Sequence, residues 1–275
     1  MRELKNCRDK TALVTGASSG IGRLLAVRLA REGARAVALV ARRDAQLAEV
    51  AREVEALGAR ALALPCDVAD RAAVLATAST ALAELGSVDL LVNNAGYGHH
   101  RRFLEWDLDD IERMLQVNFL GSIYWTKALL PQMVKRGQGW IVFVASVAGK
   151  LAVPEESAYA ASKFAMVGFA EALSMEIEDA GVHVLTVCPG TVRTDFFDEE
   201  ALRRMPPVSR RMMIEPGVLV DAILQALARG KREITVPRGI APAYLMRVVV
   251  PGILRWTTRR TTIGSLAAEP SRRLD

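Results

Sequence analysis

The sequence predicts an α/β protein built on a doubly wound parallel sheet of about seven strands. Short runs of β-branched and apolar residues alternate with longer segments in which apolar residues recur at spacings of three and four. Alternation of this kind is typical of βαβ units, whose parallel sheet is covered by helices on both faces. No internal repeat or Pro/Gly-rich linker interrupts the series. We therefore expect one domain over residues 1–237 and a C-terminal extension over residues 238–275.

Strands are expected where four to seven residues of high β propensity stand together. In chain order, these segments cover residues 11–15, 36–40, 60–64, 88–92, 140–145, 182–188 and 233–236. Helical spacing is clear after the second of them, where Leu47, Val50, Val54 and Leu57 recur at three and four. One face of that helix is therefore expected to be buried.

Composition and charge exclude several classes of protein. With 275 residues, 51% of them hydrophobic and 24% charged, the chain can bury a large core and is not a disordered protein. The net charge of +5 arises in the C-terminal extension, because residues 1–237 carry 29 basic and 29 acidic side chains. That local surplus lacks a recognisable nucleic-acid reading motif, so we expect no nucleic-acid partner.

Cysteine and histidine usage indicates neither a disulfide framework nor a metal site. Cys7, Cys66 and Cys188 are far apart and form no C-x-x-C pair, which fits a reducing, cytoplasmic compartment. His99 and His100 are expected to be a solvated loop pair, since no third metal ligand accompanies them. The charged N-terminus does not resemble a signal peptide, and no uncharged stretch reaches the roughly 18 residues of a membrane-spanning helix.

Residues 15–22, Thr-Gly-Ala-Ser-Ser-Gly-Ile-Gly, lie between the first predicted strand and the first predicted helix. Glycines at this point let the backbone approach a pyrophosphate, whose charge then meets the free N–H groups of the helix N-terminus. A purely structural turn is the alternative. The residues expected to bind the dinucleotide here are Gly16, Ser18, Ser19, Gly20, Ile21 and Gly22.

The end of the second predicted strand indicates which dinucleotide is bound. An acid at that position bonds the ribose 2′-hydroxyl of NAD, whereas an arginine suits the 2′-phosphate of NADP. Here Arg42 and Arg43 follow the strand, so NADP(H) is the preferred cofactor, with Arg42 the first candidate and Arg43 the second. Two solvated arginines are the alternative, and the nearby Asp44 keeps NAD(H) possible.

Six motifs occur in the order and approximate spacing of one enzyme family. They are the 15–22 loop, Asn93-Asn94-Ala95-Gly96, Asn118, Ser146, Tyr159-Ala160-Ala161-Ser162-Lys163 and Pro189-Gly190-Thr191-Val192-Arg193-Thr194. Over residues 11 to about 194 the chain thus resembles a classical short-chain dehydrogenase/reductase. The resemblance implies a Rossmann-type sheet and hydride exchange between a nicotinamide and a carbonyl or alcohol.

The chemistry of four side chains supports the same function. Tyr159 and Lys163 are four residues apart and share a helix face, where the ammonium can favour the phenolate and lower the pKa of the tyrosine. Tyr159 is the expected acid/base. Ser146 leaves the carboxyl end of a strand, where its hydroxyl can bind the substrate oxygen. By resemblance, Asn118 is the proton-relay residue and Lys163 also bonds the cofactor ribose.

The resemblance implies further cofactor contacts. These lie at Asp67, Val68, Asn94, Ala95, Gly96, Tyr159, Lys163, Pro189, Gly190, Val192 and Thr194. Asp67 corresponds to the family's adenine-side residue and could also be the N-cap of the helix that follows it.

The last part of the chain bears on substrate and partners. In this family the segment at about 195–216 forms a lid, which here is apolar and methionine-rich and so favours a lipophilic carbonyl substrate. Its arginines could instead recognise a carrier-bound substrate. The extension mixes apolar residues with arginines, which suits either peripheral membrane contact or packing against another subunit of a homodimer or homotetramer.

The sequence therefore predicts an NADP-preferring oxidoreductase of a lipophilic ketone, aldehyde or secondary alcohol, similar to a steroid, a retinoid or an acyl chain. One alternative is a reductase of 3-oxoacyl groups on a carrier. Another is a binding protein that senses NADP without catalysis.

Overall fold

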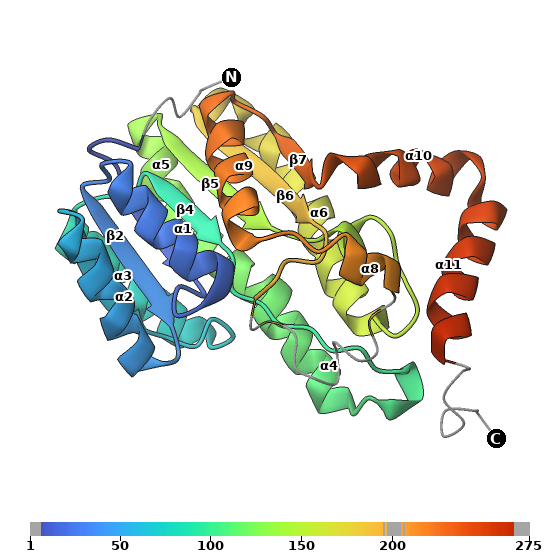
Figure 1. Ribbon diagram of the computed structural model, residues 1–275. Helices are drawn as coiled ribbons and strands as arrows, with labels where there is room; N and C mark the ends of the chain where they lie inside the picture. The colour runs from blue at the N-terminus through green and yellow to red at the C-terminus, as the bar shows by residue number, and fades with distance from the viewer. Residues whose placement is uncertain (1–6, 195, 197–204, 206, 267–275) are drawn as a thin grey trace.

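The computed structural model describes residues 7–194, 196, 205 and 207–266. Its centre is a seven-stranded parallel sheet in the order β3-β2-β1-β4-β5-β6-β7 (Figure 1). The strands are β1 (Thr11–Thr15), β2 (Ala36–Ala41), β3 (Arg60–Pro65), β4 (Leu90–Asn93), β5 (Gly139–Val144), β6 (Val182–Pro189) and β7 (Glu233–Val236). Every predicted strand is confirmed, with ends displaced by at most two residues.

Helices cover both faces of the sheet, as the alternating pattern predicts. One face carries α1 (Gly20–Arg31), α2 (Asp44–Ala56) and α9 (Pro216–Ala228). The other carries α3 (Arg71–Leu85), α5 (Gly121–Arg136) and α6 (Ser157–Glu176). The remaining described helices are α4 (Leu108–Leu115), α8 (Pro207–Arg211), α10 (Ala241–Val249) and α11 (Pro251–Leu266).

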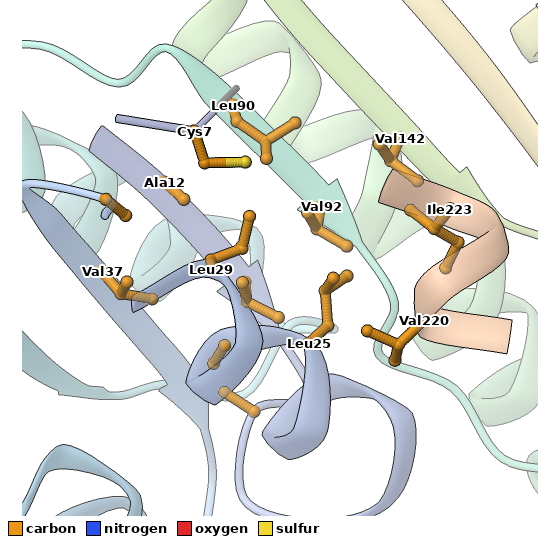
Figure 2. Packing of buried hydrophobic residues seen from close by; sticks show 14 of the residues in the cluster. Cys7, Ala12, Leu25, Leu29, Val37, Leu90, Val92, Val142, Val220 and Ile223 are labelled. Carbon is orange, nitrogen blue, oxygen red and sulfur yellow. The ribbon is translucent and has the colours of Figure 1, made fainter. Parts of the chain in front are cut away.

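Two apolar layers hold the helices on the sheet. In the layer drawn in Figure 2, Leu25 and Leu29 of α1 and Ile223 of α9 pack over Ala12 and Val92 of the sheet. All five residues are at most 1% exposed, so their apolar surface contributes fully to the hydrophobic stabilisation of the fold. The strands β1, β2, β4, β5 and β6 are buried along their whole length because helices cover both of their faces, whereas the edge strands β3 and β7 are partly exposed.

The strand order reverses between β1 and β4, which lie side by side at the centre of the sheet. Crossovers from these two strands run in opposite directions and leave a crevice at their carboxyl ends, which is where doubly wound sheets bind ligands. β1, β4, β5 and β6 all end at this edge, so the residues that follow them are brought together.

The segment after β6 and the C-terminal extension complete the chain. Residues 195, 197–204 and 206 of the expected 195–216 lid lie outside the described residues, whereas Phe196, Met205 and α8 are described. The extension forms α10, which runs outward from the end of β7, and α11, which turns away from it (Figure 1). Across the described residues, no helix has both the length and the apolar character needed to cross a bilayer.

Candidate active site and cofactor pocket

A cavity of about 410 Å³ opens at the carboxyl edge of the sheet, beside the crevice between β1 and β4. Most of the expected site residues line it. They are Gly16, Ser18, Ser19, Gly20, Ile21, Arg42, Arg43, Val68, Asn94, Ala95, Gly96, Ser146, Tyr159, Lys163, Pro189, Gly190, Val192 and Thr194. Three other expected residues, Gly22, Asp67 and Asn118, are not among the lining residues.

The glycine-rich loop is folded against the end of β4. Gly16 has a φ of +67°, and a Cβ there would lie 2.9 Å from Nδ2 of Asn94. A Cβ on Gly22 would lie only 2.3 Å from the carbonyl oxygen of Gly16, so this glycine lets α1 start directly beneath the loop. Gly22 therefore shapes the loop through close backbone packing and does not face the cavity.

Thr15, which the sequence analysis did not single out, ties the loop to β4. Its Oγ1 donates to the carbonyl oxygen of Val92 at 3.2 Å and accepts from the N–H groups of Asn94 at 2.9 Å and Ala95 at 3.0 Å. Nδ2 of Asn94 donates in turn to the carbonyl oxygen of Thr15 at 2.9 Å. A threonine ending a strand beside an Asn-Asn motif is a weak signal, because the pairing of β1 with β4 becomes evident only in the fold.

The two arginines after β2 occupy different positions at the cavity. Nη2 of Arg43 donates to the hydroxyls of Ser18 at 3.0 Å and Ser19 at 2.9 Å, which places its guanidinium at the glycine-rich loop. Arg42 also lines the cavity, and its charge favours ionisation of Asp67. Arg43 thus contacts the glycine-rich loop directly, although its place in the sequence made Arg42 the first candidate.

Asp67 is held beside the cavity by another part of the chain. Burial opposes its ionisation, but the N–H of Ala69 and the guanidinium of Arg113 hold the pKa of this carboxyl below its usual range. The alternative that Asp67 caps the next helix is wrong. The cap of α3 is Asp70, whose carboxylate accepts from the N–H groups of Ala72 and Ala73.

Ser146 and Tyr159 meet at the cavity wall. Ser146 follows β5 and caps a short 3₁₀ turn, with Oγ accepting from the N–H of Ala148 at 3.0 Å. Burial raises the pKa of Tyr159, which is the reverse of the lowering expected from Lys163, while a hydrogen bond with Ser146 acts in the opposite direction. The desolvation of the phenolate outweighs that bond, so the phenol is held in its protonated form.

Lys163 lies one turn after Tyr159 on α6. Its Nζ is 5.7 Å from the centroid of the Tyr159 ring and donates to the carbonyl oxygen of Val144 at 3.0 Å. The side chain is 3% exposed, and burial lowers the pKa of its ammonium to about 8. A cation with so little hydration is well suited to bind the hydroxyls of a ribose.

Asn118 lies behind the cavity wall in a π-helical turn (Gln116–Leu120) between α4 and α5. Its Oδ1 accepts from the N–H of Tyr97 at 2.9 Å, and its Nδ2 donates to the carbonyl oxygen of Tyr97 and to Oγ of Ser162. The same Oδ1 is 3.1 Å from where a Cβ on Gly96 would lie. Asn118 therefore fixes the loop after β4 against α6, close to the lysine.

His100 does not fit the expected picture of a solvated pair. Its side chain is 9% exposed, and Nδ1 lies 3.4 Å from Oε1 of Glu156, the residue before α6. Burial raises the pKa of Glu156 to about 7, and the charge of this carboxylate raises the pKa of Tyr159. His99 instead packs edge-on against the ring of Tyr97. The two histidines pack this way because the loop after β4 folds back over the start of α6.

Sequence reasoning missed several walls of the cavity. They are Ala41, Cys66, Tyr97, Val117, Val144 and Ala145, whereas Phe196, which also lines the cavity, belongs to the apolar lid expected at about 195–216. The ring of Phe196 stands edge-on to that of Tyr159, with centroids 6.0 Å apart. Apolar side chains in such positions carry no chemical signature in a sequence, so only their place in the fold reveals them.

The residues present suit a dinucleotide. The loop packs closely at Gly16 and Gly22, Ser19 and Gly20 bring the N-terminus of α1 to the cavity, and Arg43 supplies a cation beside that loop. A helix N-terminus of this kind suits phosphate groups. The part of the chain that the structure describes holds no cluster of three or more His, Cys, Asp or Glu side chains suited to a metal ion.

Comparison with known proteins agrees with this architecture. The short chain dehydrogenase family model matches residues 10–204. A Drosophila melanogaster protein named dehydrogenase/reductase SDR family protein 7-like is 34% identical over 92% of this chain and 81% of its own length. A ketoacyl reductase, HetN, from Nostoc sp. is 34% identical over 82% of this chain and 78% of its own length.

A solved structure also matches the fold of this chain. A metagenomic short-chain oxidoreductase in complex with NADP superposes with a TM-score of 0.72 at 30% identity, covering 84% of this chain and 97% of the other. The fold and site define a nicotinamide-dependent oxidoreductase on a Rossmann-type sheet. The chain belongs to the short-chain dehydrogenase/reductase family and is an NAD(P)-dependent enzyme.

Proposed function

We propose that this enzyme prefers NADP(H) and exchanges a hydride between the nicotinamide and a lipophilic ketone, aldehyde or secondary alcohol. The observation that carries the proposal is one cavity lined by Ser146, Tyr159 and Lys163 together with Arg43. The first three supply the groups that carbonyl chemistry needs, and the last supplies a cation for a phosphate.

Reduction of a carbonyl adds a hydride to carbon and a proton to oxygen. The bound cofactor supplies the hydride. Tyr159 donates the proton from its phenol, which burial keeps protonated. Ser146 bonds the same substrate oxygen as negative charge develops on it, and Lys163 positions the ribose while its charge stabilises the phenolate that remains. Alcohol oxidation runs these steps backwards, with Tyr159 accepting the proton.

The preference for NADP rests on Arg43 at the hydroxyls of Ser18 and Ser19, with Arg42 beside it. An additional phosphate at this place gains charge-assisted hydrogen bonds that the 2′-hydroxyl of NAD cannot make. The NADP complex of the metagenomic relative supports this choice.

The preference for a lipophilic substrate rests on the wall around Tyr159. Phe196 packs edge-on against this tyrosine, and Tyr97, Val117 and Val144 also line the cavity. Apolar walls of this kind favour the binding of a substrate with an alkyl chain or a ring, because its apolar surface is buried against them. Steroid-, retinoid- and acyl-like carbonyls are the classes we propose.

A reductase of 3-oxoacyl groups on a carrier is the second candidate. It is favoured by the likeness to the Nostoc ketoacyl reductase. Arg210 and Arg211 at the end of α8 are cations that a carrier phosphate could meet.

One experiment separates these candidates. The absorbance at 340 nm is followed with NADPH or NADH over a panel of steroid, retinoid, acyl-thioester and small polar carbonyl compounds. We expect turnover with NADPH and an apolar carbonyl, and none in the Tyr159→Phe variant. Equal rates with small polar carbonyls would refute the lipophilic substrate, and faster turnover of 3-oxoacyl thioesters would favour the second candidate.

Compartment and assembly complete the proposal. Cys7, Cys66 and Cys188 are buried free thiols, which is compatible with a reducing, cytoplasmic compartment. Members of the family generally form oligomers. We propose a homodimer or homotetramer here, which light scattering of the purified protein would distinguish.

A further inference from the structure

The first helix of the extension is attached to the enzyme through its polar side. On α10, the hydroxyl of Tyr244 lies 3.2 Å from Oγ1 of Thr235. The ammonium of Lys150 lies over the ring of Tyr244, 5.3 Å from its centroid. Nη1 of Arg247 donates to the carbonyl oxygen of Lys150 at 2.6 Å, and its guanidinium stacks over Phe164 at 4.6 Å. These contacts fix which face of α10 meets the protein.

Another side of α10 is apolar and exposed. Leu245, Val248 and Val249 share this face at spacings of three and four, and their side chains are 67%, 78% and 65% exposed. An amphipathic helix on a globular protein normally turns such residues inward. Here Tyr244 and Arg247 face the protein and the apolar side chains face outward. Exposed apolar side chains that lie together in this way indicate an interaction surface.

The second helix, α11, also exposes apolar side chains, and it carries cations beside them. Ile253 and Trp256 of α11 are 57% and 58% exposed, and the guanidinium of Arg260 lies over the Trp256 ring at 4.7 Å. Arg255 and Arg259 on the same helix are exposed. Residues 238–266 contain five arginines and no acidic residue. Over residues 238–266 the extension therefore combines apolar side chains with charge of one sign.

We propose that α10 and α11 dock the enzyme on an anionic lipid surface, with Leu245, Val248, Val249, Ile253 and Trp256 in contact with the acyl region. This goes beyond the proposed function, which needs no membrane. A bilayer with acidic headgroups offers phosphate for the arginines and hydrocarbon for the apolar face within one surface. Tryptophan beside arginine suits the boundary between headgroups and acyl chains.

The first test measures sedimentation of the full-length enzyme with vesicles of phosphatidylcholine, alone or with about one-third phosphatidylglycerol. We expect binding only to the mixed vesicles, weakened by high salt. In the α10 variant Leu245→Gln/Val248→Gln/Val249→Gln the bound fraction should fall by about tenfold or more. The matched control changes three exposed apolar residues of the main domain, Leu57→Gln/Leu75→Gln/Val218→Gln, and should bind as the parent does.

The charge requirement has its own pair of variants. Arg255→Gln/Arg259→Gln should lose most binding to the mixed vesicles, whereas Arg52→Gln/Arg71→Gln on α2 and α3 should not. Turnover of a water-soluble carbonyl with NADPH should be the same in all five proteins, which shows that each variant is folded.

The tryptophans provide a direct reporter. Trp106, Trp125 and Trp140 are at most 8% exposed, so Trp256 is the exposed one of the four. Brominated phospholipids in the mixed vesicles should quench part of the emission of the parent and almost none of that of Trp256→Phe.

Three results would overturn the proposal. One is a parent enzyme that does not sediment with the mixed vesicles. Another is equal binding by the α10 variant and its control. The third is a smaller particle mass for the α10 variant by light scattering, since this would mean that a second copy of the chain covers the face. None of these outcomes depends on the substrate, so the proposed function is tested separately.

Discussion

The ammonium of Lys163 donates to the carbonyl oxygen of Val144 at 3.0 Å, inside a wall that leaves the lysine 3% exposed. Burial lowers the pKa of this lysine from 10.5 to about 8. At ~1.4 kcal/mol per unit of pKa change, this lowering means that burial destabilises the charged form relative to the neutral form by about 3 kcal/mol. The site therefore holds a cation at the expense of stability.

Replacing Lys163 by an uncharged residue should therefore make the folded protein more stable. Lys163→Met removes the buried charge, and we expect a melting temperature a few degrees above that of the parent at pH 7, with turnover lost. The folded parent releases this proton near pH 8, whereas the unfolded chain keeps it to about 10.5. As the pH rises from about 8 to about 10.5, the unfolding free energy of the parent should therefore increase relative to that of the variant. Calorimetry at pH 7 and pH 9 checks this, and an equal difference at both would contradict it.

Tyr159→Phe should lower turnover by at least about a thousandfold, because the proton for the substrate oxygen is removed with the hydroxyl. The ring and its packing against Phe196 remain, so NADPH affinity should change by less than about threefold. Turnover is followed at 340 nm and binding by fluorescence titration of NADPH. Substantial turnover in the variant would refute the role of Tyr159.

Arg43→Gln should raise the KM for NADPH by about tenfold to a hundredfold and leave that for NADH nearly unchanged, because a charge-assisted contact to the 2′-phosphate is lost. The control is Arg52→Gln, an exposed arginine on α2. Arg42→Asp should also weaken NADP relative to NAD. A larger effect at position 42 than at position 43 would restore the order expected from the sequence.

Glu156 should shape the pH dependence of reduction. Burial raises the pKa of its carboxyl to about 7, His100 is its neighbour at 3.4 Å, and its charge raises the pKa of Tyr159. Glu156→Gln removes the charge, so the pKa of the phenol should fall. The alkaline limb of kcat for carbonyl reduction should then move to lower pH. Glu171→Gln, at an exposed position of α6, is the control and should leave the profile unchanged.

Two glycines should respond oppositely to alanine. Gly22→Ala places a Cβ 2.3 Å from the carbonyl oxygen of Gly16 and should cost about 1–3 kcal/mol of unfolding free energy, with weaker binding of both cofactors. Gly168→Ala on α6 meets nothing within 4 Å and should stabilise by about 0.5–1 kcal/mol. Urea denaturation measures both. A neutral Gly22→Ala would show that the loop need not approach α1 so closely.

Local patterns were enough to predict the strands, the glycine-rich loop and the Tyr159–Lys163 pair. Each depends on neighbours within a few residues, such as β propensity, a glycine at positive φ, or a spacing of four on a helix. The order of motifs along the chain then sufficed for the family resemblance, because parallel strands deliver their carboxyl ends to one edge.

Tertiary structure decided the features that join distant segments. It placed Arg43 on the serines of the loop, gave Asp67 to Arg113 and brought His100 to Glu156. It also reversed the expected pKa change of Tyr159, because desolvation depends on everything packed around a group, whereas the sequence shows only which charge is near along the helix. For the same reason, the arginine-rich composition of the extension was evident from the sequence, but only the docking of α10 through Tyr244 and Arg247 determined which side chains face outward.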